Sequence, residues 1–174
     1  MGGVNDPGAI VARLKEAGAT VATAESLTGG RVAARITDVP GASAVFVGGI
    51  VSYATAVKIS VLGVPADLVA DHGVVSAECA KAMAEGVRAL LGTTYGVSTT
   101  GVAGPDTQEG KPVGTVFVGV ASPSGTQVVA LQLDGDRGEI QVSTVSETLS
   151  ALAGIMEAEE RSPAGREPEH PGLG

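Results

Sequence analysis

The chain has 174 residues, a formal net charge of −8 and only 2% aromatic residues. Nucleic-acid surfaces need clustered Lys and Arg, and single-strand binders usually add stacking aromatics. Neither pattern is present, so we expect no direct nucleic-acid binding. No apolar run is long enough to cross a membrane, and the start of the chain lacks signal-peptide features. With one cysteine, Cys79, and therefore no internal disulfide, the composition favours the reducing cytoplasm.

Helical and strand patterns alternate through the first hundred residues. Asp6-Pro7 is typical of an N-cap followed by the first residue of a helix, and Gly18 would end that helix. Short apolar runs bounded by turn residues predict strands, and apolar residues at helical spacing predict helices. The further expected strands are 19–24, 45–53 and 95–100, and the further expected helices are 30–37, a short one through Lys58 and Leu62, 65–71 and 76–91.

The second half begins with a glycine-rich loop, 101–113. Strands at 115–121 and 127–133 are joined by Pro123-Ser124-Gly125, a hairpin signal, and a last helix should cover 137–156. From Glu159 on, three Pro and three Gly among several charges predict a disordered tail. We therefore expect one domain at 1–158 and a tail at 159–174. The domain should be an α/β fold, a three-layer α/β/α sandwich with a mixed, mostly parallel sheet.

Three candidate functional positions follow predicted strands. They are Ser26, Tyr53 and the loop after Thr100. Ligands of such folds bind at the carboxyl ends of the strands, so these positions should converge. Ser26 stands on a strand-to-helix turn near a helix N-terminus, where proteins place either a nucleophile or a phosphate. The sequence alone leaves both roles open.

A serine nucleophile needs a base to remove its proton. His72 adjoins Gly73 in a turn and His170 lies in the predicted tail, so neither suits that role. Lys58 is the lone cation in an apolar segment, and a buried lysine with a lowered pKa can act as a base. The alternative is a surface lysine that packs its stem on apolar neighbours. For Tyr53 the alternative is a half-buried core residue.

No metal site or nucleotide-hydrolysing loop is expected. The run from Gly104 to Lys111 has five residues between its glycines, and Pro112 replaces the required Ser or Thr, so it is not a phosphate loop. Its backbone N–H groups could still bind an anion. No His or Cys cluster has ligand spacing. Asp106 and Glu109 are loop carboxylates, typically solvated, that could meet a cation.

Four segments of the chain stand out together: TAESLTGG (23–30), GGIVSYATAVKISVLGV (48–64), STTGVAGPDTQEGKPVGTVFVGVA (98–121) and GDR (135–137). In this order they resemble a known family, the C-terminal domain of competence/damage-inducible protein CinA, and the resemblance covers about residues 7–156. The family includes stand-alone nicotinamide-nucleotide amidases, described as serine/lysine amidohydrolases with a three-layer α/β/α fold. The resemblance therefore implies hydrolysis of nicotinamide mononucleotide to nicotinate mononucleotide and ammonia, in pyridine nucleotide salvage.

The resemblance also implies roles for individual residues. Ser26 would be the nucleophile, Lys58 its base, and Tyr53 would orient Lys58 or the serine hydroxyl. Backbone N–H groups near Gly29-Gly30 or 101–103 would hold the oxyanion. No cofactor or metal is implied. The remaining substrate-binding candidates, mainly for the phosphate end, are Thr28, Thr100, Gly101, Gly104 and Arg137.

The chain departs from the family pattern at two points. Gln141 follows Ile140 where the family commonly has arginine, and 54–57 lack the Asn that relatives often carry before the lysine. The N-terminal domain of larger CinA proteins, similar to molybdopterin-binding proteins, has no counterpart in these residues. Two alternatives stay open: a non-catalytic competence or DNA-damage protein, and a nucleotide-sensing domain. The expected partner is a small-molecule nucleotide, and Ala/Val-rich helices are compatible with a homo-oligomer.

Overall fold

The computed structural model describes residue 3 and residues 5–162, and every helix and strand expected from the sequence pattern is present. The helices are α1 (Pro7–Glu16), α2 (Arg31–Thr37), α3 (Thr55–Ser60), α4 (Ala66–His72), α5 (Ala77–Leu91) and α6 (Arg137–Arg161), with a 3-10 turn at Ala42–Ala44. The strands are β1 (Val21–Glu25), β2 (Phe46–Val51), β3 (Tyr95–Gly101), β4 (Thr115–Ser122) and β5 (Gly125–Gln132).

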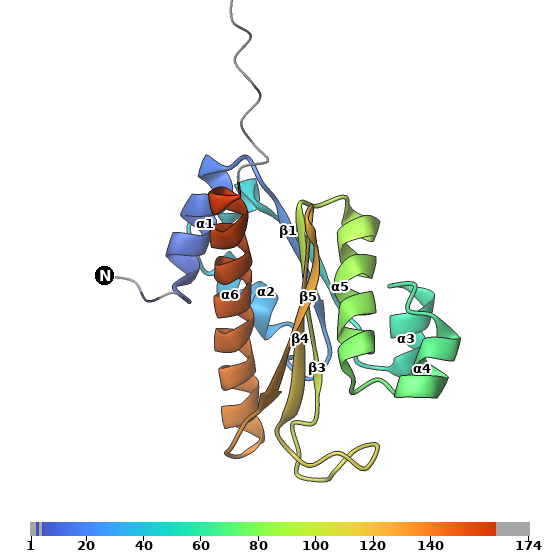
Figure 1. Cartoon of the computed structure of the whole chain (residues 1–174). Coiled ribbons are helices and arrows are strands. Elements are labelled where there is room, and N and C mark those ends of the chain that lie inside the picture. The colour runs from blue at the N-terminus through green and yellow to red at the C-terminus, as the bar shows by residue number, and fades with distance from the viewer. Residues whose placement is uncertain (1–2, 4, 163–174) are drawn as a thin grey trace, which may run out of the picture.

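The five strands form one mixed sheet in the order β2-β1-β3-β4-β5. β1 pairs in parallel with β2 and with β3, whereas β3–β4 and β4–β5 are antiparallel. Helices α1, α2 and α6 cover one face, and α3, α4 and α5 lie on the other (Figure 1). The expected three-layer α/β/α fold is confirmed. Because β1, β2 and β3 run the same way, the segments that follow them leave the same edge of the sheet.

Small aliphatic side chains fill the space on both faces of the sheet. All five residues of β1 are buried, as expected for a central strand covered on both sides. One core packs Ile10 of α1 and Ile36 of α2 against Leu152 of α6. The opposite core packs Met83 and other residues of α5 against the segments around α3 and α4. No helix among the described residues is long and apolar enough to cross a membrane.

The last helix extends beyond the end that its sequence pattern indicates. α6 reaches Arg161, so its final turn enters the segment expected to be a disordered tail. Glu159 accepts hydrogen bonds from Tyr95 Oη and Ser124 Oγ, both at 2.7 Å, and Glu160 pairs with Arg13 at 2.9 Å. These ties order the last turn although its composition is polar. The rest of the expected tail, 163–174, lies outside the described residues.

Two helical glycines should respond oppositely to alanine. A Cβ on Gly86 of α5 would lie 2.0 Å from the carbonyl oxygen of Leu62, which is backbone and cannot move aside cheaply. Gly154 of α6 has open space around it. We expect Gly154→Ala to stabilise the fold by about 0.5–1 kcal/mol through helix propensity. We expect Gly86→Ala to destabilise it by about 1–3 kcal/mol through overpacking. Urea unfolding of both variants checks the pair, and equal shifts of the same sign would contradict it.

Candidate active site

A cavity of about 350 Å³ lies at the carboxyl edge of the three parallel strands. The segments after β1, β2 and β3 form its walls, together with α3 and the first residue of α6. Of the residues predicted from sequence, the cavity is lined by Ser26, Tyr53, Lys58, Thr100, Gly101, Gly104 and Arg137. The convergence expected at this edge is therefore present in the fold.

Ser26 is the first residue after β1, and its main chain is held by the neighbouring strand. Its N–H donates to the carbonyl oxygen of Thr99 at 3.0 Å and also lies 3.3 Å from the Thr99 hydroxyl. Its own hydroxyl faces the cavity, where Oγ is 2.9 Å from Nζ of Lys58. At the end of β1, the backbone of Ser26 therefore stays hydrogen-bonded to β3, while its side-chain hydroxyl faces the cavity.

Lys58 reaches the serine from α3, and its side chain is almost completely buried. The residue is 1% exposed, and burial lowers the pKa of its amine because the charged form loses water. Nζ lies 2.6 Å from the carbonyl oxygen of Ser52 and 3.3 Å from that of Tyr53. Within the described part of the chain, no carboxylate lies at ion-pair distance from this amine.

The surroundings of Nζ suit a neutral amine that takes a proton. A neutral amine has two N–H bonds and one lone pair. In that state the carbonyls of Ser52 and Tyr53 can accept the two N–H groups, which leaves the lone pair to accept the proton of the Ser26 hydroxyl, whereas a charged amine donates to all three oxygens. A hydroxyl and a base at hydrogen-bond distance are the arrangement that activates a serine nucleophile. The alternative of a surface lysine that packs its stem on apolar neighbours is excluded, because Lys58 is buried.

Tyr53 contacts the lysine through its backbone rather than its phenol. The residue is 61% exposed, and its hydroxyl accepts a hydrogen bond from Nη2 of Arg137 at 3.0 Å. Nη1 of Arg137 donates to the carbonyl oxygen of Gly104 at 2.7 Å. The structure therefore does not place the phenol where it could orient Lys58. Tyr53, Arg137 and Gly104 instead meet on one side of the cavity.

Three predicted substrate-binding residues lie outside the cavity lining. Thr28 is fully buried, and its hydroxyl lies 2.6 Å from a carboxylate oxygen of Glu25 and 2.8 Å from the hydroxyl of Thr99. The Gly29 N–H donates to the carbonyl of Ser26, and Gly30 is the N-cap of α2. The turn after Ser26 uses its polar groups to begin a helix, so Thr28 is not placed to hold a phosphate, and Gly29 and Gly30 are not placed to hold the oxyanion.

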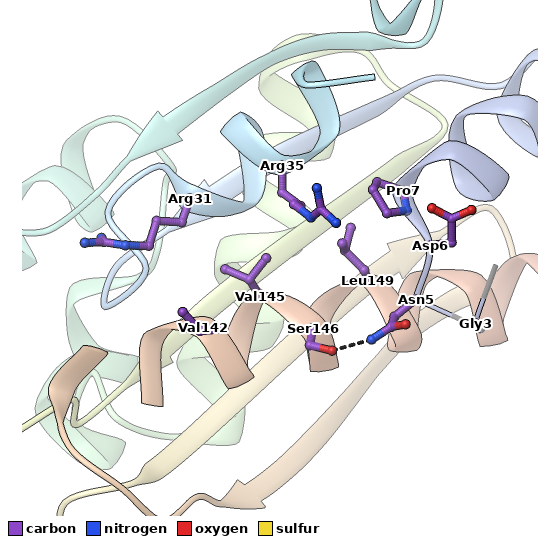
Figure 2. Close-up of a pocket in the computed structure, with 10 residues that line it drawn as sticks. All are labelled: Gly3, Asn5, Asp6, Pro7, Arg31, Arg35, Val142, Val145, Ser146 and Leu149. Atoms are coloured by element: carbon purple, nitrogen blue, oxygen red, sulfur yellow. Dashed lines mark hydrogen bonds between the residues drawn. The ribbon is translucent and has the colours of Figure 1, made fainter. Parts of the chain in front are cut away.

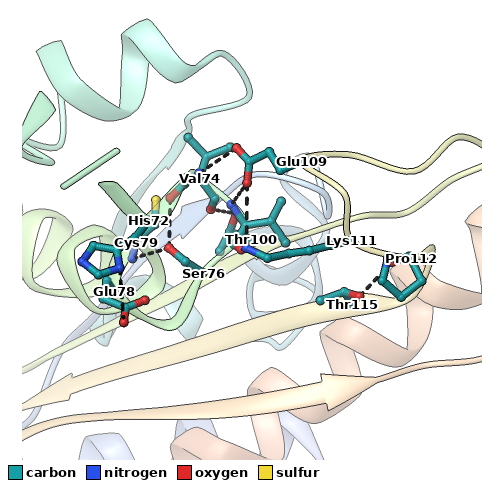
Figure 3. Close-up of polar contacts among 12 residues, drawn as sticks. His72, Val74, Ser76, Glu78, Cys79, Thr100, Glu109, Lys111, Pro112 and Thr115 are labelled. Carbon is teal, nitrogen blue, oxygen red and sulfur yellow. Dashed lines mark hydrogen bonds and ion pairs between the residues drawn. The ribbon is translucent and has the colours of Figure 1, made fainter. Parts of the chain in front are cut away.

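The glycine-rich loop is attached to the turn that precedes α5. Glu109 accepts the N–H groups of Val74 and Val75 at 2.9 and 3.0 Å, and Lys111 donates to the carbonyl of Val75. Thr100 donates to the carbonyl of Val74 at 2.6 Å, beside these contacts (Figure 3). Glu109 thus has a structural role that its sequence context did not indicate. The described residues contain no group of three His, Cys, Asp or Glu that could hold a metal.

Gln141, which stands where the resemblance led us to expect arginine, also has a structural role. Gln141 is buried in α6, and its Nε2 donates to the carbonyl of Leu27 at 2.9 Å. Gln141 therefore supports the turn that follows Ser26 and does not line the cavity. Its neutral amide provides a donor at this buried place without an additional charge.

A second cavity, of about 550 Å³, lies between the N-terminal segment, α2 and α6 (Figure 2). Its lining includes Arg31 and Arg35, whose side chains point in different directions, beside Val145 and Leu149. None of the residues predicted for the site lies in it. The smaller cavity, which brings a hydroxyl and a buried amine together, is therefore the candidate active site.

The fold and this cavity define an α/β/α protein with a serine–lysine pair at the carboxyl edge of its sheet. The family model for the CinA C-terminal domain matches residues 7–156, and the chain belongs to this family. A CinA-like protein from Frankia casuarinae is 52% identical over 164 residues, which is 91% of this chain and 38% of that protein. A putative competence-damage inducible protein from Desulforamulus reducens is 50% identical, over 78% of this chain and 33% of that protein.

Solved structures agree with the family match. A CinA superfamily protein from Klebsiella pneumoniae has a TM-score of 0.85 at 28% identity, and covers 90% of this chain and 99% of its own. A competence/damage inducible protein from Agrobacterium tumefaciens has a TM-score of 0.83 at 32% identity, and covers 89% of this chain and 96% of its own. The chain spans about a third of the length of the first curated relatives.

Proposed function

We propose that the protein is an amidohydrolase that converts nicotinamide mononucleotide to nicotinate mononucleotide and ammonia in the cytoplasm. The observation that carries this proposal is the 2.9 Å contact between Ser26 Oγ and the buried amine of Lys58 inside a cavity. Such a pair is suited to acyl transfer, because the lysine can remove the serine proton and return it to the leaving group.

The proposed reaction proceeds in two stages. Lys58 takes the proton of Ser26 while Oγ attacks the carboxamide carbon, and the carbonyl oxygen becomes an oxyanion. The C–N bond then breaks as Lys58 protonates the departing nitrogen, which releases ammonia and leaves an ester on Ser26. Water attacks this ester, Lys58 accepts the water proton and returns it to Oγ, and the carboxylic acid leaves.

The oxyanion needs N–H donors that are not already engaged. The N–H of Ser26 donates to Thr99, that of Gly29 to Ser26, and that of Val102 to Thr115. Leu27 and Ala103 line the cavity, and across residues 5–162 no hydrogen bond is formed by their N–H groups. The proposal therefore assigns the oxyanion to these two amides, instead of the Gly29-Gly30 pair. Removing one such donor typically costs about 3–4 kcal/mol of transition-state stabilisation.

The phosphate end of the substrate is assigned to Arg137 and the backbone near Gly101 and Gly104. Arg137 lies on the cavity wall and presents a planar guanidinium, which suits a phosphate. A bound phosphate would exchange with its present partners, the Gly104 carbonyl and the Tyr53 hydroxyl. The same cavity would take a single nucleotide, so a small molecule is the proposed partner.

Arg137→Gln is expected to raise the KM for nicotinamide mononucleotide by about ten- to hundredfold, because a charge-assisted hydrogen bond is worth about 1.5–3 kcal/mol. The kcat should change much less, since the phosphate lies away from the reacting carbon. Arg161→Gln, the same change near the other end of α6, is the matched control and should leave KM unchanged. An Arg137 variant with unaltered KM would contradict the phosphate assignment.

Release of ammonia from nicotinamide mononucleotide by the purified chain tests the proposed function. Nicotinamide and its riboside should be much poorer substrates, because they lack the phosphate. Thermal stabilisation by the nucleotide without ammonia release would indicate a nucleotide-sensing domain instead. If the nucleotide neither stabilises the chain nor releases ammonia, and the chain instead binds DNA in a salt-sensitive way or binds a protein partner, a non-catalytic role in competence or DNA damage would be favoured, as the names of relatives suggest.

A further inference from the structure

Glu25 is a buried acidic residue that the proposed reaction does not use. It immediately precedes Ser26 and is 1% exposed. One carboxylate oxygen accepts the Thr28 hydroxyl at 2.6 Å and the Val32 N–H at 2.8 Å, and the other accepts the Ala33 N–H at 3.0 Å. Burial of a carboxylate is costly unless its oxygens receive hydrogen bonds. The carboxylate of Glu25 receives all three of these hydrogen bonds from groups in the turn after Ser26 or at the start of α2.

The hydrogen bonds around Glu25 have one consistent direction. The Thr28 hydroxyl donates its single proton to Glu25, so it accepts from the Thr99 hydroxyl at 2.8 Å. The Thr99 hydroxyl oxygen is then free to accept the N–H of Ser26 at 3.3 Å, as a second acceptor beside the Thr99 carbonyl oxygen at 3.0 Å. The chain of donors thus runs from the Ser26 amide through Thr99 and Thr28 to the Glu25 carboxylate. We call these three side chains the Glu25 relay.

The relay closes a loop around the nucleophile. Glu25 and Thr28 are joined through their side chains, and Ser26 lies between them in the chain. The same carboxylate holds the first turn of α2, while Thr99 belongs to the neighbouring strand β3. Strand, turn and helix are therefore tied to one buried group adjacent to Ser26.

We propose that Glu25, with Thr28 and Thr99, is a positioning residue that aims the hydroxyl of Ser26 at Lys58. This inference deepens the proposed function and rests on it, because it assigns the relay to the orientation of that nucleophile. The reactive geometry requires Oγ to lie within hydrogen-bond reach of Nζ, and an error of about 1 Å can cost a hundredfold in rate. None of the three relay side chains needs to touch the substrate.

Thr28→Val tests the relay, because valine keeps the shape of threonine and removes its hydroxyl. We expect kcat for ammonia release to fall about ten- to hundredfold with little change in KM. Labelling of Ser26 by a fluorophosphonate reagent, followed by mass spectrometry, should slow by a similar factor. Thr28→Ser, which restores the hydroxyl, should recover most of both rates, which would tie the loss to the hydroxyl and not to the shape of the side chain.

The matched control is Thr148→Val. Thr148 is equally buried, but its hydroxyl donates to the carbonyl of Thr144 within α6, and it belongs neither to the relay nor to the cavity lining. This variant should show any general cost of losing a buried hydroxyl in urea unfolding, while Ser26 labelling stays at the wild-type rate. Equal labelling of Thr28→Val and Thr148→Val would overturn the proposal.

Glu25→Gln is the second variant, and it tests whether the relay positions Ser26 if Thr28→Val does not fold. The amide nitrogen of glutamine would face either the Ala33 N–H or the Val32 N–H, and two donors cannot pair with each other, so the hydrogen bonds of the relay cannot all be kept. A Glu25→Gln protein with normal labelling and normal kcat would overturn the proposal. A wild-type chain that releases no ammonia would overturn the proposed function, while the labelling comparison would still decide the positioning role.

Discussion

Ser26→Ala is expected to reduce ammonia release from nicotinamide mononucleotide by about four to six orders of magnitude, to a residual rate. The substitution removes the one atom placed to form the acyl ester, Oγ, which faces Lys58 at 2.9 Å. The cavity and its N–H groups remain, so substrate affinity should change little. Ammonia release at saturating nucleotide measures the loss in kcat, and isothermal titration measures binding.

Ser98→Ala is the control for Ser26→Ala. Ser98 lies on β3 and is buried, its hydroxyl donates to the carbonyl of Ala80 in α5, and it does not line the cavity. This variant should retain normal kcat even if it is somewhat less stable. In the wild type, a rapid quench should trap an ester on Ser26, which mass spectrometry can locate. A Ser26→Ala rate within tenfold of wild type would exclude the serine as nucleophile.

The sequence allowed the fold and the position of the site to be predicted because both depend on local patterns. Short apolar runs indicated strands, the intervening periodicities indicated helices, and strands that run the same way must end at the same edge. That argument alone brought Ser26, Tyr53 and the loop after Thr100 together. The apolar neighbours of Lys58 made it a candidate base, since burial lowers the pKa of a lysine, but they left a surface lysine open, and the family resemblance decided between the two.

The polar contacts across the fold could not be predicted in the same way. Thr28 was expected to face a phosphate, but its hydroxyl is engaged by Thr99, which is distant in sequence. Tyr53 was expected to act through its phenol, whereas its carbonyl contacts the lysine. Glu25 carried a weak signal, since an acid in a fully buried strand must find donors. Which donors it finds depends on how β3 and α2 pack.

Lys58→Met is expected to lower kcat by about two to four orders of magnitude, the usual contribution of a positioned general base. Methionine keeps an unbranched side chain of similar length but has no proton acceptor of useful basicity. Ser26 would then have to lose its proton to water. Lys81→Met is the matched control, because Lys81 is an exposed lysine on α5 that pairs with Glu85. It should leave both kcat and KM unchanged.

The pH profile distinguishes a base from a fixed positive charge at Lys58. As a base, Lys58 must be neutral in the free enzyme, so kcat/KM should rise with pH and level off above the pKa of the amine. Burial lowers that pKa, which places the rising limb below the value for a lysine in water, about 10.4. The rate at which a fluorophosphonate labels Ser26 should follow the same rising limb.

Lys58→Arg, which keeps a cation that does not deprotonate in proteins, should be as inactive as Lys58→Met. An active arginine variant with a flat profile would assign Lys58 to charge stabilisation and leave the serine to another base.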